Sequence, residues 1–430
     1  MLTRMCPVSS DAKPVSAQTS GDQETHSVRR VLRRLYPVIP FLAILYAFLR
    51  GTFAQGPRDI DTRYFFIAGK AWVHGESPYD FSCYQTLWHQ YFSENVTSGV
   101  FAYLPGSILY AAPLGMLDWP EARALFHWMN LAALLGIVLL CLRYTRSMAP
   151  ASRSLPRYLW LAFGVAIGGV PGTIFTGQST LMVCLAALAV VMLHGRYLLL
   201  LVPAILVASS KPQLTAPALI ITALGEPLVC RRIWLAGAIA VGISVLAILP
   251  DAMPFTHLSG SVLNNASLGA NTSANMIGLG PLLNAVGLSG VYGRVLQLLA
   301  FLFALVLVVW SMLKIRPVGS LPMPAAGMAC FTIMGLAYPF HEYDTAFLIP
   351  MCAMLGLMSF RRQMVLLPLL LVLSRPGLIE LASRVLGRTE MFRNRVFGLC
   401  WLLATVTILW WTVVDSSGRS SRATAWAGQS

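Results

Sequence analysis

Two aspartates stand near the start of the first long polar segment, DIDTRYFFIAGKAWVHGESPYD, which runs from Asp59 to Asp80. A carboxylate acts as a general base when it lies within hydrogen-bond reach of the proton that it removes. Asp61 is the first candidate for this role, and Asp59 is the second. The alternative is that Asp61 only caps a helix. That helix would be amphipathic and would lie on the membrane through Phe65, Phe66, Ala68 and Trp72.

Two cationic side chains are candidates for binding an anion. Lys211 lies in SSKPQ between two apolar segments, and His341 begins the sequence HEYD. Preorganised cations and hydrogen-bond donors stabilise a negative charge that develops during a reaction. The alternatives are that Lys211 extends from the end of a membrane span toward water, and that HEYD caps a helix that Tyr343 anchors at the interface. The basic segment from Arg375 to Arg395 is a weaker third candidate.

Further polar and aromatic residues are candidates for binding a substrate by hydrogen bonds or stacking. Aromatic residues are also common at membrane interfaces, where they only anchor the protein. The GQST sequence can equally serve a turn. The pattern holds no dense carboxylate group and no C-x-x-C pair, so we expect no metal and no other cofactor. The substrate-binding candidates are Tyr64, Tyr103, Gln178, Glu342 and Asp344.

The elements that must position these residues follow from the composition. Of the 430 residues, 57% are hydrophobic and only 11% are charged, and the mean hydropathy is +0.67. Such a chain has too little polar surface to cover a soluble globule. Apolar segments of roughly 17 to 25 residues recur from Leu35 to Val414, and each has the length of one helical membrane crossing. We therefore expect an all-α polytopic membrane protein.

Charged residues set the expected orientation. The net charge of +14 is dispersed through the loops, which favours a topological role over nucleic-acid binding. The basic cluster from Arg29 to Arg34 places the N-terminus inside, so the first span, residues 35–54, leads outward. Residues 1–28 and 415–430 are expected to be cytoplasmic tails, the first of them disordered. The transmembrane domain is expected to cover residues 29–414.

About twelve spans are expected in total. The segment 101–117 is short and contains Pro105 and Pro113, so we expect it to lie on the outer face rather than cross. Basic loops then fall inside, and the candidate residues from Asp59 to Asp344 gather outside. The segments expected to cross after the first span are 121–142, 158–175, 178–194, 197–210, 212–224, 233–250, 291–313, 325–340, 345–360, 363–374 and 396–414.

The order of these motifs resembles glycosyltransferase family 87, which includes the mycobacterial polyprenyl-phosphate-mannose-dependent mannosyltransferases. The likeness runs from about Leu35 to Pro350. It consists of D-x-x-Y, G-x-x-P-Y-D, Y-x-P, GQ before a span, KP after a span, and HEYD. The residues that carry the first three motifs are Asp61 and Tyr64, Gly75, Pro78, Tyr79 and Asp80, and Tyr103 to Pro105.

The resemblance implies a GT-C fold whose long first extracytoplasmic loop carries membrane-surface helices. It also implies hexose transfer, usually with inversion, from a polyprenyl-phosphate donor to an acceptor hydroxyl outside the cytoplasm. Mannose is the first candidate sugar, and the acceptor is a glycolipid or a glycan. Asp61 stands at the family's loop aspartate, and Lys211 and His341 would meet the donor phosphate. The implied location is a bacterial inner membrane.

Two other classes of function fit a polytopic chain. A transporter or flippase of lipid-linked sugars would be built from symmetric halves with discontinuous helices at the midplane, and we find no internal repeat. A non-catalytic scaffold would not need Asp61 or polar groups gathered on one side. Loss of transfer on mutation of Asp61 would distinguish the enzyme from both.

Overall fold

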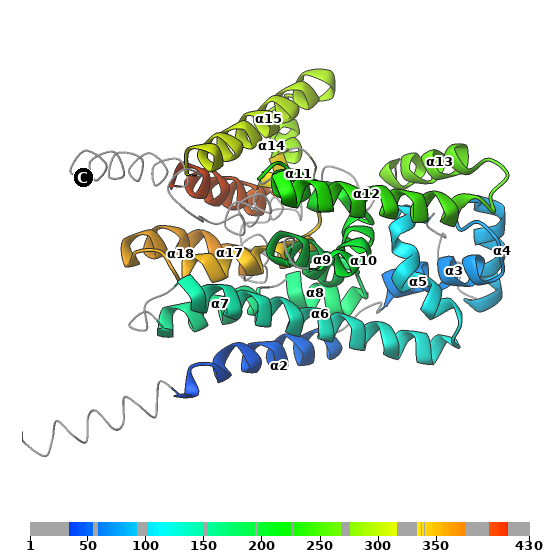
Figure 1. Ribbon diagram of the computed structural model, residues 1–430, viewed down its shortest axis with the longest axis horizontal. Helices are drawn as coiled ribbons and strands as arrows, with labels where there is room; N and C mark the ends of the chain where they lie inside the picture. Colours follow the sequence, from blue (N-terminus) through cyan, green and yellow to red (C-terminus); the bar gives the residue numbers. More distant parts are fainter. Residues whose placement is uncertain are drawn as a thin grey trace, which may run out of the picture.

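Helices account for all the regular structure in the part of the chain that the structure describes, as lipid requires of a spanning chain. One isolated antiparallel β-bridge joins Ile277 and Phe340. The structure is a computed structural model (Figure 1). It describes residues 34–54, 59–92, 101–148, 154–167, 169–193, 197–225, 227–267, 276–315, 333–336, 338, 340–374 and 395–411.

The elements follow the expected apolar segments closely. The N-terminal elements are α2 (Val38–Thr52), α3 (Ile60–Val73), α4 (Phe81–Tyr91), η1 (Pro105–Ser107), α5 (Ile108–Gly115) and α6 (Trp119–Met148). The central elements are α7 (Ser154–Ala166), α8 (Gly169–Thr176), α9 (Thr180–Leu193), α10 (Leu198–Ser209), α11 (Pro212–Gly225) and α12 (Pro227–Ile248). The remaining elements are α13 (Pro254–Ser267), α14 (Leu279–Ala285), α15 (Gly290–Ile315), η5 (Glu342–Phe347), α17 (Leu348–Leu355), α18 (Phe360–Ser374) and an apolar helix over Arg395–Trp411.

Three of the described helices are long and apolar enough to cross a membrane. They cover Trp119–Arg146, Arg231–Ile248 and Gly290–Trp310. The pair α7 and α8 passes the same test as one unit bent by 40°, which gives up to four spans. Most remaining apolar helices are shorter than a full crossing, so the total of about twelve stays a prediction.

The long helices expose their apolar side chains to the outside of the molecule. Only 17% of the most apolar window of α15 is buried, and Phe303 and Val306 on it are more than half exposed. Water would make such a surface unfavourable, whereas lipid would not. The arrangement is that of an integral membrane protein.

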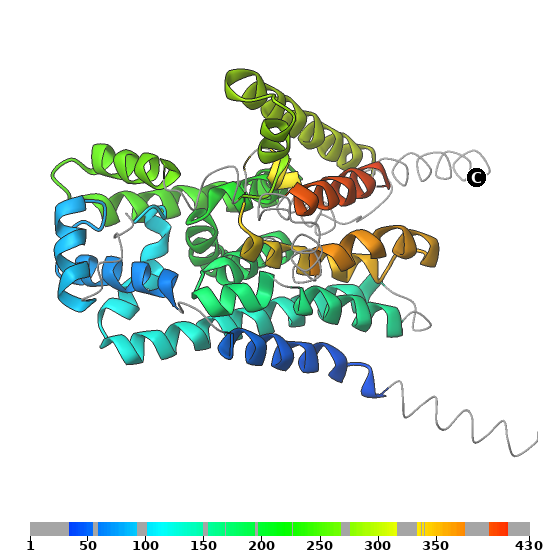
Figure 2. The ribbon, with the colours of Figure 1, turned by 180° about the vertical axis from the view of Figure 1, so that it is seen from behind.

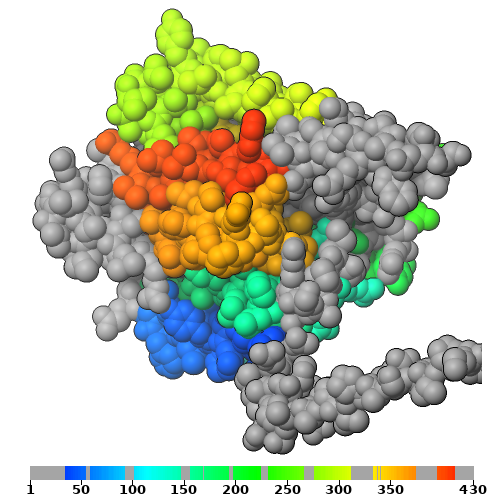
Figure 3. All heavy atoms as spheres, turned by 90° about the vertical axis from the view of Figure 1, so that its left-hand side faces the viewer, coloured from blue at the N-terminus to red at the C-terminus, as the bar shows by residue number. Residues whose placement is uncertain are grey.

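The helices lie in a layered bundle with a distinct end. In Figures 1 and 2, α3, α4, α5 and α13 gather at one end, beside the N-terminal end of α6 and the C-terminal end of α12. Figure 3 shows the opposite end, where α15, the helix 395–411, α18, α7 and α2 are stacked in that order. The first polar segment of the sequence therefore forms a cap at one end of the bundle.

The apolar face of α3 is buried in the protein, so its expected contact with the membrane was wrong. Phe65, Phe66 and Ala68 are fully buried. The Phe65 ring stacks on Phe126 of α6, with ring centroids 5.3 Å apart. Trp72 donates a hydrogen bond of 2.9 Å to the carbonyl of Ala247 at the end of α12. The face that could have covered lipid instead joins α3 to the bundle.

One expected short segment is found, and one expected span is broken. Residues 101–117 form η1 and α5, and Pro113 lies inside α5, so this segment is helical but short, as expected. The segment 158–175 is not one helix, because α7 ends at Ala166 and α8 begins at Gly169. The two tails, most of 325–340 and most of the loop from Arg375 to Arg395 lie outside the described residues.

Candidate active site

Lys211 is the centre of a buried polar cluster formed by segments that are far apart in the sequence. It is only 4% exposed. Its Nζ donates to Gln178 Oε1 at 2.9 Å, to Thr180 Oγ1 at 2.9 Å and to Asp344 Oδ1 at 3.2 Å. The interpretation of Lys211 as a side chain that extends to water was therefore wrong. Three of the residues singled out in the sequence lie in direct contact.

Two helix junctions place Lys211 and Gln178 face to face. Lys211 stands between α10 and α11, and Pro212 is the first residue of α11, where its missing N–H leaves no hydrogen bond unmade. Gln178 follows Gly177, which ends α8 with a φ of 71°. Glycine accepts this left-handed conformation at little cost. The short motifs KP and GQ thus lie at junctions between helices, where their polar side chains contact each other.

The HEYD sequence contributes to the cluster through Asp344. Asp344 Oδ2 accepts a hydrogen bond of 3.2 Å from the backbone N–H of His341, while its Oδ1 accepts from Thr180 at 2.8 Å and from Lys211. HEYD therefore both stabilises the start of η5 and contributes to the cluster. Glu342 is half-buried beside it, and its carbonyl accepts from the hydroxyl of Thr345.

Aromatic rings enclose the lysine. The Nζ of Lys211 lies 5.2 Å from the ring centroid of Tyr343 and 5.6 Å from that of Tyr103. These are cation–π distances. The imidazole of His341 stacks on Tyr343 with centroids 4.9 Å apart, and burial is the main cause that lowers the pKa of His341 below its ordinary value. The neutral imidazole is therefore favoured.

Tyr103 joins the cluster, and Tyr64 packs elsewhere on α3. The hydroxyl of Tyr103 donates to Gln178 Oε1 at 2.8 Å, and burial raises the pKa of Tyr103 well above its ordinary value, so it stays a donor. The ring of Tyr64 packs against Trp88 of α4 with centroids 5.2 Å apart. Of the two tyrosines, Tyr103 has the direct link to the lysine's partners.

Asp61, the second residue of α3, faces the same cluster. Its carboxyl interacts with the side chains of Gln178 and Thr176 and is electrostatically coupled to Lys211 and Asp344. Because Gln178 Oε1 accepts from Tyr103 and Lys211, its amide NH₂ is left to donate to Asp61. Burial is the largest cause that raises the pKa of Asp61 to about 6. This carboxyl can exchange a proton near neutral pH.

Asp59 faces α6 and belongs to a different set of contacts. It is 2% exposed. One carboxylate oxygen lies 2.5 Å from Arg123 Nε, and the other lies 2.8 Å from His127 Nε2. Asp59 occupies the N-cap position of α3 without a side-chain cap hydrogen bond, so Asp61 is not the cap.

Arg123 and His127 were not among the site residues predicted from the sequence. Their spacing of four residues puts them on one face of α6, but it does not identify their partner. Within the described residues, no group of three or more His, Cys, Asp or Glu side chains has an arrangement that could hold a metal ion.

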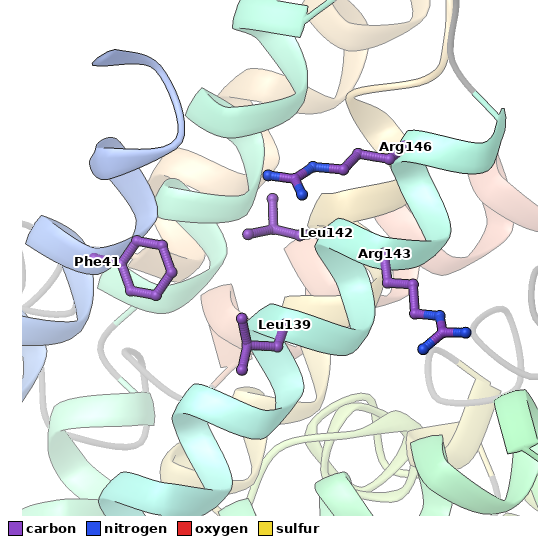
Figure 4. Close-up of a pocket in the computed structure, with 5 residues that line it drawn as sticks. All are labelled: Phe41, Leu139, Leu142, Arg143 and Arg146. Atoms are coloured by element: carbon purple, nitrogen blue, oxygen red, sulfur yellow. The ribbon is translucent and has the colours of Figure 1, made fainter. Parts of the chain in front are cut away.

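A separate cavity of about 650 Å³ lies away from this cluster (Figure 4). It opens between α2 and the C-terminal part of α6, whereas His127 is near the other end of α6. Arg143 lies sixteen positions after His127, which corresponds to about 24 Å along a helix. We place the candidate active site at the polar cluster because interacting titratable groups converge there. The cavity is lined by Phe41, Leu139, Leu142, Arg143 and Arg146.

The spanning helices and the buried acid–lysine cluster define an integral membrane protein with an enzyme-like site. Residues 101–339, more than half of the chain, match the model of glycosyltransferase family 87, and the chain belongs to this family. It is therefore a membrane glycosyltransferase. Comparisons with curated proteins and with solved structures gave no match.

The matched region contains only part of the cluster. Tyr103, Gln178 and Lys211 lie within residues 101–339, whereas Asp61 precedes this region and Asp344 follows it. The fold brings Asp61 and Asp344 to the same lysine.

Proposed function

We propose that the protein transfers a hexose, with mannose as the first candidate, from a polyprenyl-phosphate donor to an acceptor hydroxyl on the extracytoplasmic side. The observation that carries the proposal is that Asp61 and Lys211 meet at Gln178. One supplies a titratable carboxyl, and the other supplies a buried cation. Transfer of a sugar from a phosphate needs both a base and a site for a negative leaving group.

Asp61 acts as the general base in this proposal. It accepts the proton of the acceptor hydroxyl as the acceptor oxygen forms a bond to the anomeric carbon. The bond from that carbon to the phosphate oxygen breaks, and its electron pair leaves with the polyprenyl phosphate. One such displacement inverts the anomeric configuration. Asp61 then releases its proton to water.

Lys211 meets the phosphate. An ammonium group has three N–H donors, and Gln178, Thr180 and Asp344 accept from all three. A bound phosphate must therefore replace one of these acceptors. The contact to Asp344 is the longest of the three and is the first choice for exchange. His341, as neutral imidazole, would add an N–H donor beside the lysine rather than a second full charge.

The remaining candidates would bind the sugar or its carrier. Gln178, Glu342 and Asp344 can hydrogen-bond sugar hydroxyls, and Tyr103 and Tyr64 can stack or donate. The donor would enter from the bilayer, and the acceptor would be a glycolipid or a glycan. We infer a GT-C architecture of about twelve spans in a bacterial inner membrane. Membership of a transferase family favours this activity over transport of lipid-linked sugars.

The proposal is tested with purified protein reconstituted in lipid. Wild type, Asp61→Asn and Asp118→Asn are each given a panel of labelled polyprenyl-phosphate hexoses and a lipid and glycan extract of the source organism. Asp118 is an exposed carboxylate before α6 and serves as the matched control. We expect wild type and Asp118→Asn to transfer one sugar at rates within twofold, and Asp61→Asn to be at least 100-fold slower.

Other outcomes would redirect or refute the proposal. Equal transfer by wild type and Asp61→Asn would move the base to Asp59 or to the HEYD segment. Folded wild type that transfers no sugar from any polyprenyl phosphate in the panel would refute this donor class.

A further inference from the structure

Asp59 holds an unusual backbone conformation just before α3. Among the described residues it is the only non-glycine residue with a positive φ, at 57°. Its N–H donates to the carbonyl of Phe175 at the end of α8, and its carbonyl accepts from the N–H of Arg63, both at 3.1 Å. This conformation is uncommon for residues other than glycine, asparagine and aspartate. It starts α3 directly against the end of α8.

The side chain of Asp59 fixes the same point to a second helix. Its buried carboxylate pairs with Arg123 and His127, which lie one turn apart on α6. A buried carboxylate without partners is strongly unfavourable, so these two contacts hold the start of α3 against α6. Asp59 is thus tied to α8 by its backbone and to α6 by its side chain.

A second anchor lies on the other side of Asp61. The hydroxyl of Thr62 donates to the carbonyl of Gly177 at 3.4 Å. A Cβ atom at Gly177 would collide with that hydroxyl, so Thr62 and the turn are in close approach. Asp61 lies between these anchors, two residues after Asp59 and one before Thr62. The direction of its carboxyl is therefore set from both sides.

We propose that Asp59, Arg123 and His127 form a clamp that positions Asp61 for the transfer reaction. The inference rests on the proposed function of Asp61. It assigns to Asp59 the part of a positioning residue, and not that of the alternative base. Because a misplacement of about 1 Å can slow a reaction by 10²-fold, releasing this clamp should lower the rate of the chemical step more than the binding of the donor.

The variants that test the clamp replace its charged side chains by neutral polar ones and are compatible with the backbone. Asp59→Asn removes the charge but retains a residue that tolerates a positive φ. Arg123→Gln removes the other charge, and Arg123→Lys retains a cation. Arg146→Gln, an exposed arginine at the far end of α6, is the control. We expect kcat to fall 10- to 100-fold in Asp59→Asn and in Arg123→Gln, with KM for the donor within threefold of wild type.

The pattern among variants separates the clamp from other roles. The double variant Asp59→Asn/Arg123→Gln should have a kcat within about threefold of that of the slower single variant. The reason is that both substitutions disrupt the same contact between Asp59 and Arg123. Arg123→Lys should be within about fivefold of wild type, and Arg146→Gln should match it. An unchanged kcat in Asp59→Asn and Arg123→Gln would overturn the clamp. So would transfer that is lost in Asp59→Asn but normal in Arg123→Gln, which would make Asp59 the base.

The melting temperature tests the clamp without any measurement of enzyme activity, so this test holds even if the proposed donor class is wrong. If the clamp holds Asp61 in its half-buried position, Asp61→Asn should raise the melting temperature at pH 8 in the wild-type background. The same change should raise it by less than half as much in the Asp59→Asn background. An equal rise in both would overturn the clamp. Inactive wild type would refute the proposed donor alone, whereas active wild type with normal clamp variants would refute the clamp alone.

Discussion

Replacing Asp61 by asparagine should stabilise the protein at neutral and alkaline pH. Folding raises the pKa of Asp61 from its ordinary 3.8 to about 6, chiefly because burial disfavours the charged form. The folded protein therefore holds this proton more tightly than the unfolded chain. The stability contributed by the proton is fully present below pH 3.8 and is lost as the pH rises through 6. Asparagine cannot ionise, so Asp61→Asn avoids this loss.

The expected gain in stability of Asp61→Asn follows from the size of the pKa shift. A shift of one pKa unit corresponds to 1.36 kcal/mol, so the change from 3.8 to about 6 corresponds to about 3 kcal/mol in the free energy of unfolding. This is an upper value, because the side chain is partly accessible to solvent. The difference between Asp61→Asn and wild type should be full above pH 7 and should shrink toward zero near pH 4.

Thermal unfolding in detergent, followed by tryptophan fluorescence at pH 4.5, 6 and 8, checks this prediction. Asp61→Asn should melt a few degrees above wild type at pH 8 and together with it at pH 4.5. Asp118→Asn should show no such pH-dependent gain. A variant that is less stable than wild type at pH 8, or a gain that grows toward low pH, would refute the assignment of Asp61 as a buried carboxyl with a raised pKa.

Three further outcomes are expected. The transfer rate should rise through one ionisation near pH 6 and then level off, since Asp61 must be ionised to act as a base; a rate that falls over this range would contradict that role. Lys211→Met should leave Asp344 buried without its cation and lower stability by about 3–5 kcal/mol, while Lys211→Arg should melt closer to wild type; an unchanged melting temperature in Lys211→Met would count against the pair. Gly177→Ala should lower kcat because the added Cβ collides with Thr62 at the start of α3. Gly237→Ala on α12 should leave kcat unchanged, because no atom lies near the added Cβ. Equal effects of the two substitutions on kcat would argue against the close approach of Gly177 and Thr62.

The sequence predicted the class of fold and the centre of the candidate site for one physical reason. Polar side chains at membrane depth are unfavourable unless they are paired or functional, so Lys211, Gln178 and Asp344 stood out among apolar neighbours. The expectation that they share one side of the membrane fits their direct contact in the structure. Helix positions were also predictable, because apolar runs end at Gly, Pro or charged residues.

Other features depended on information that local sequence does not hold. The apolar face of α3 is equally compatible with lipid and with protein, and only the approach of α5 and α6 decides that Phe65 is buried. Arg123 and His127 look like ordinary residues at the start of a span, since Asp59 is more than sixty positions away. The break between α7 and α8 did have a signal, the GGVPG sequence, because paired glycines and a proline weaken a helix.

The Lys211–Asp344 pair gives the protein an internal competitor for any anion that comes to the lysine. A phosphate must replace Asp344 as the acceptor of one Lys211 hydrogen bond. The loss of that hydrogen bond offsets part of the attraction between the phosphate and the lysine. Lys211 therefore binds any such anion more weakly than a lysine without these acceptors would. If the donor is a polyprenyl phosphate, as proposed, the product is an anionic lipid, and the return of the Asp344 carboxylate to Lys211 would help to release it.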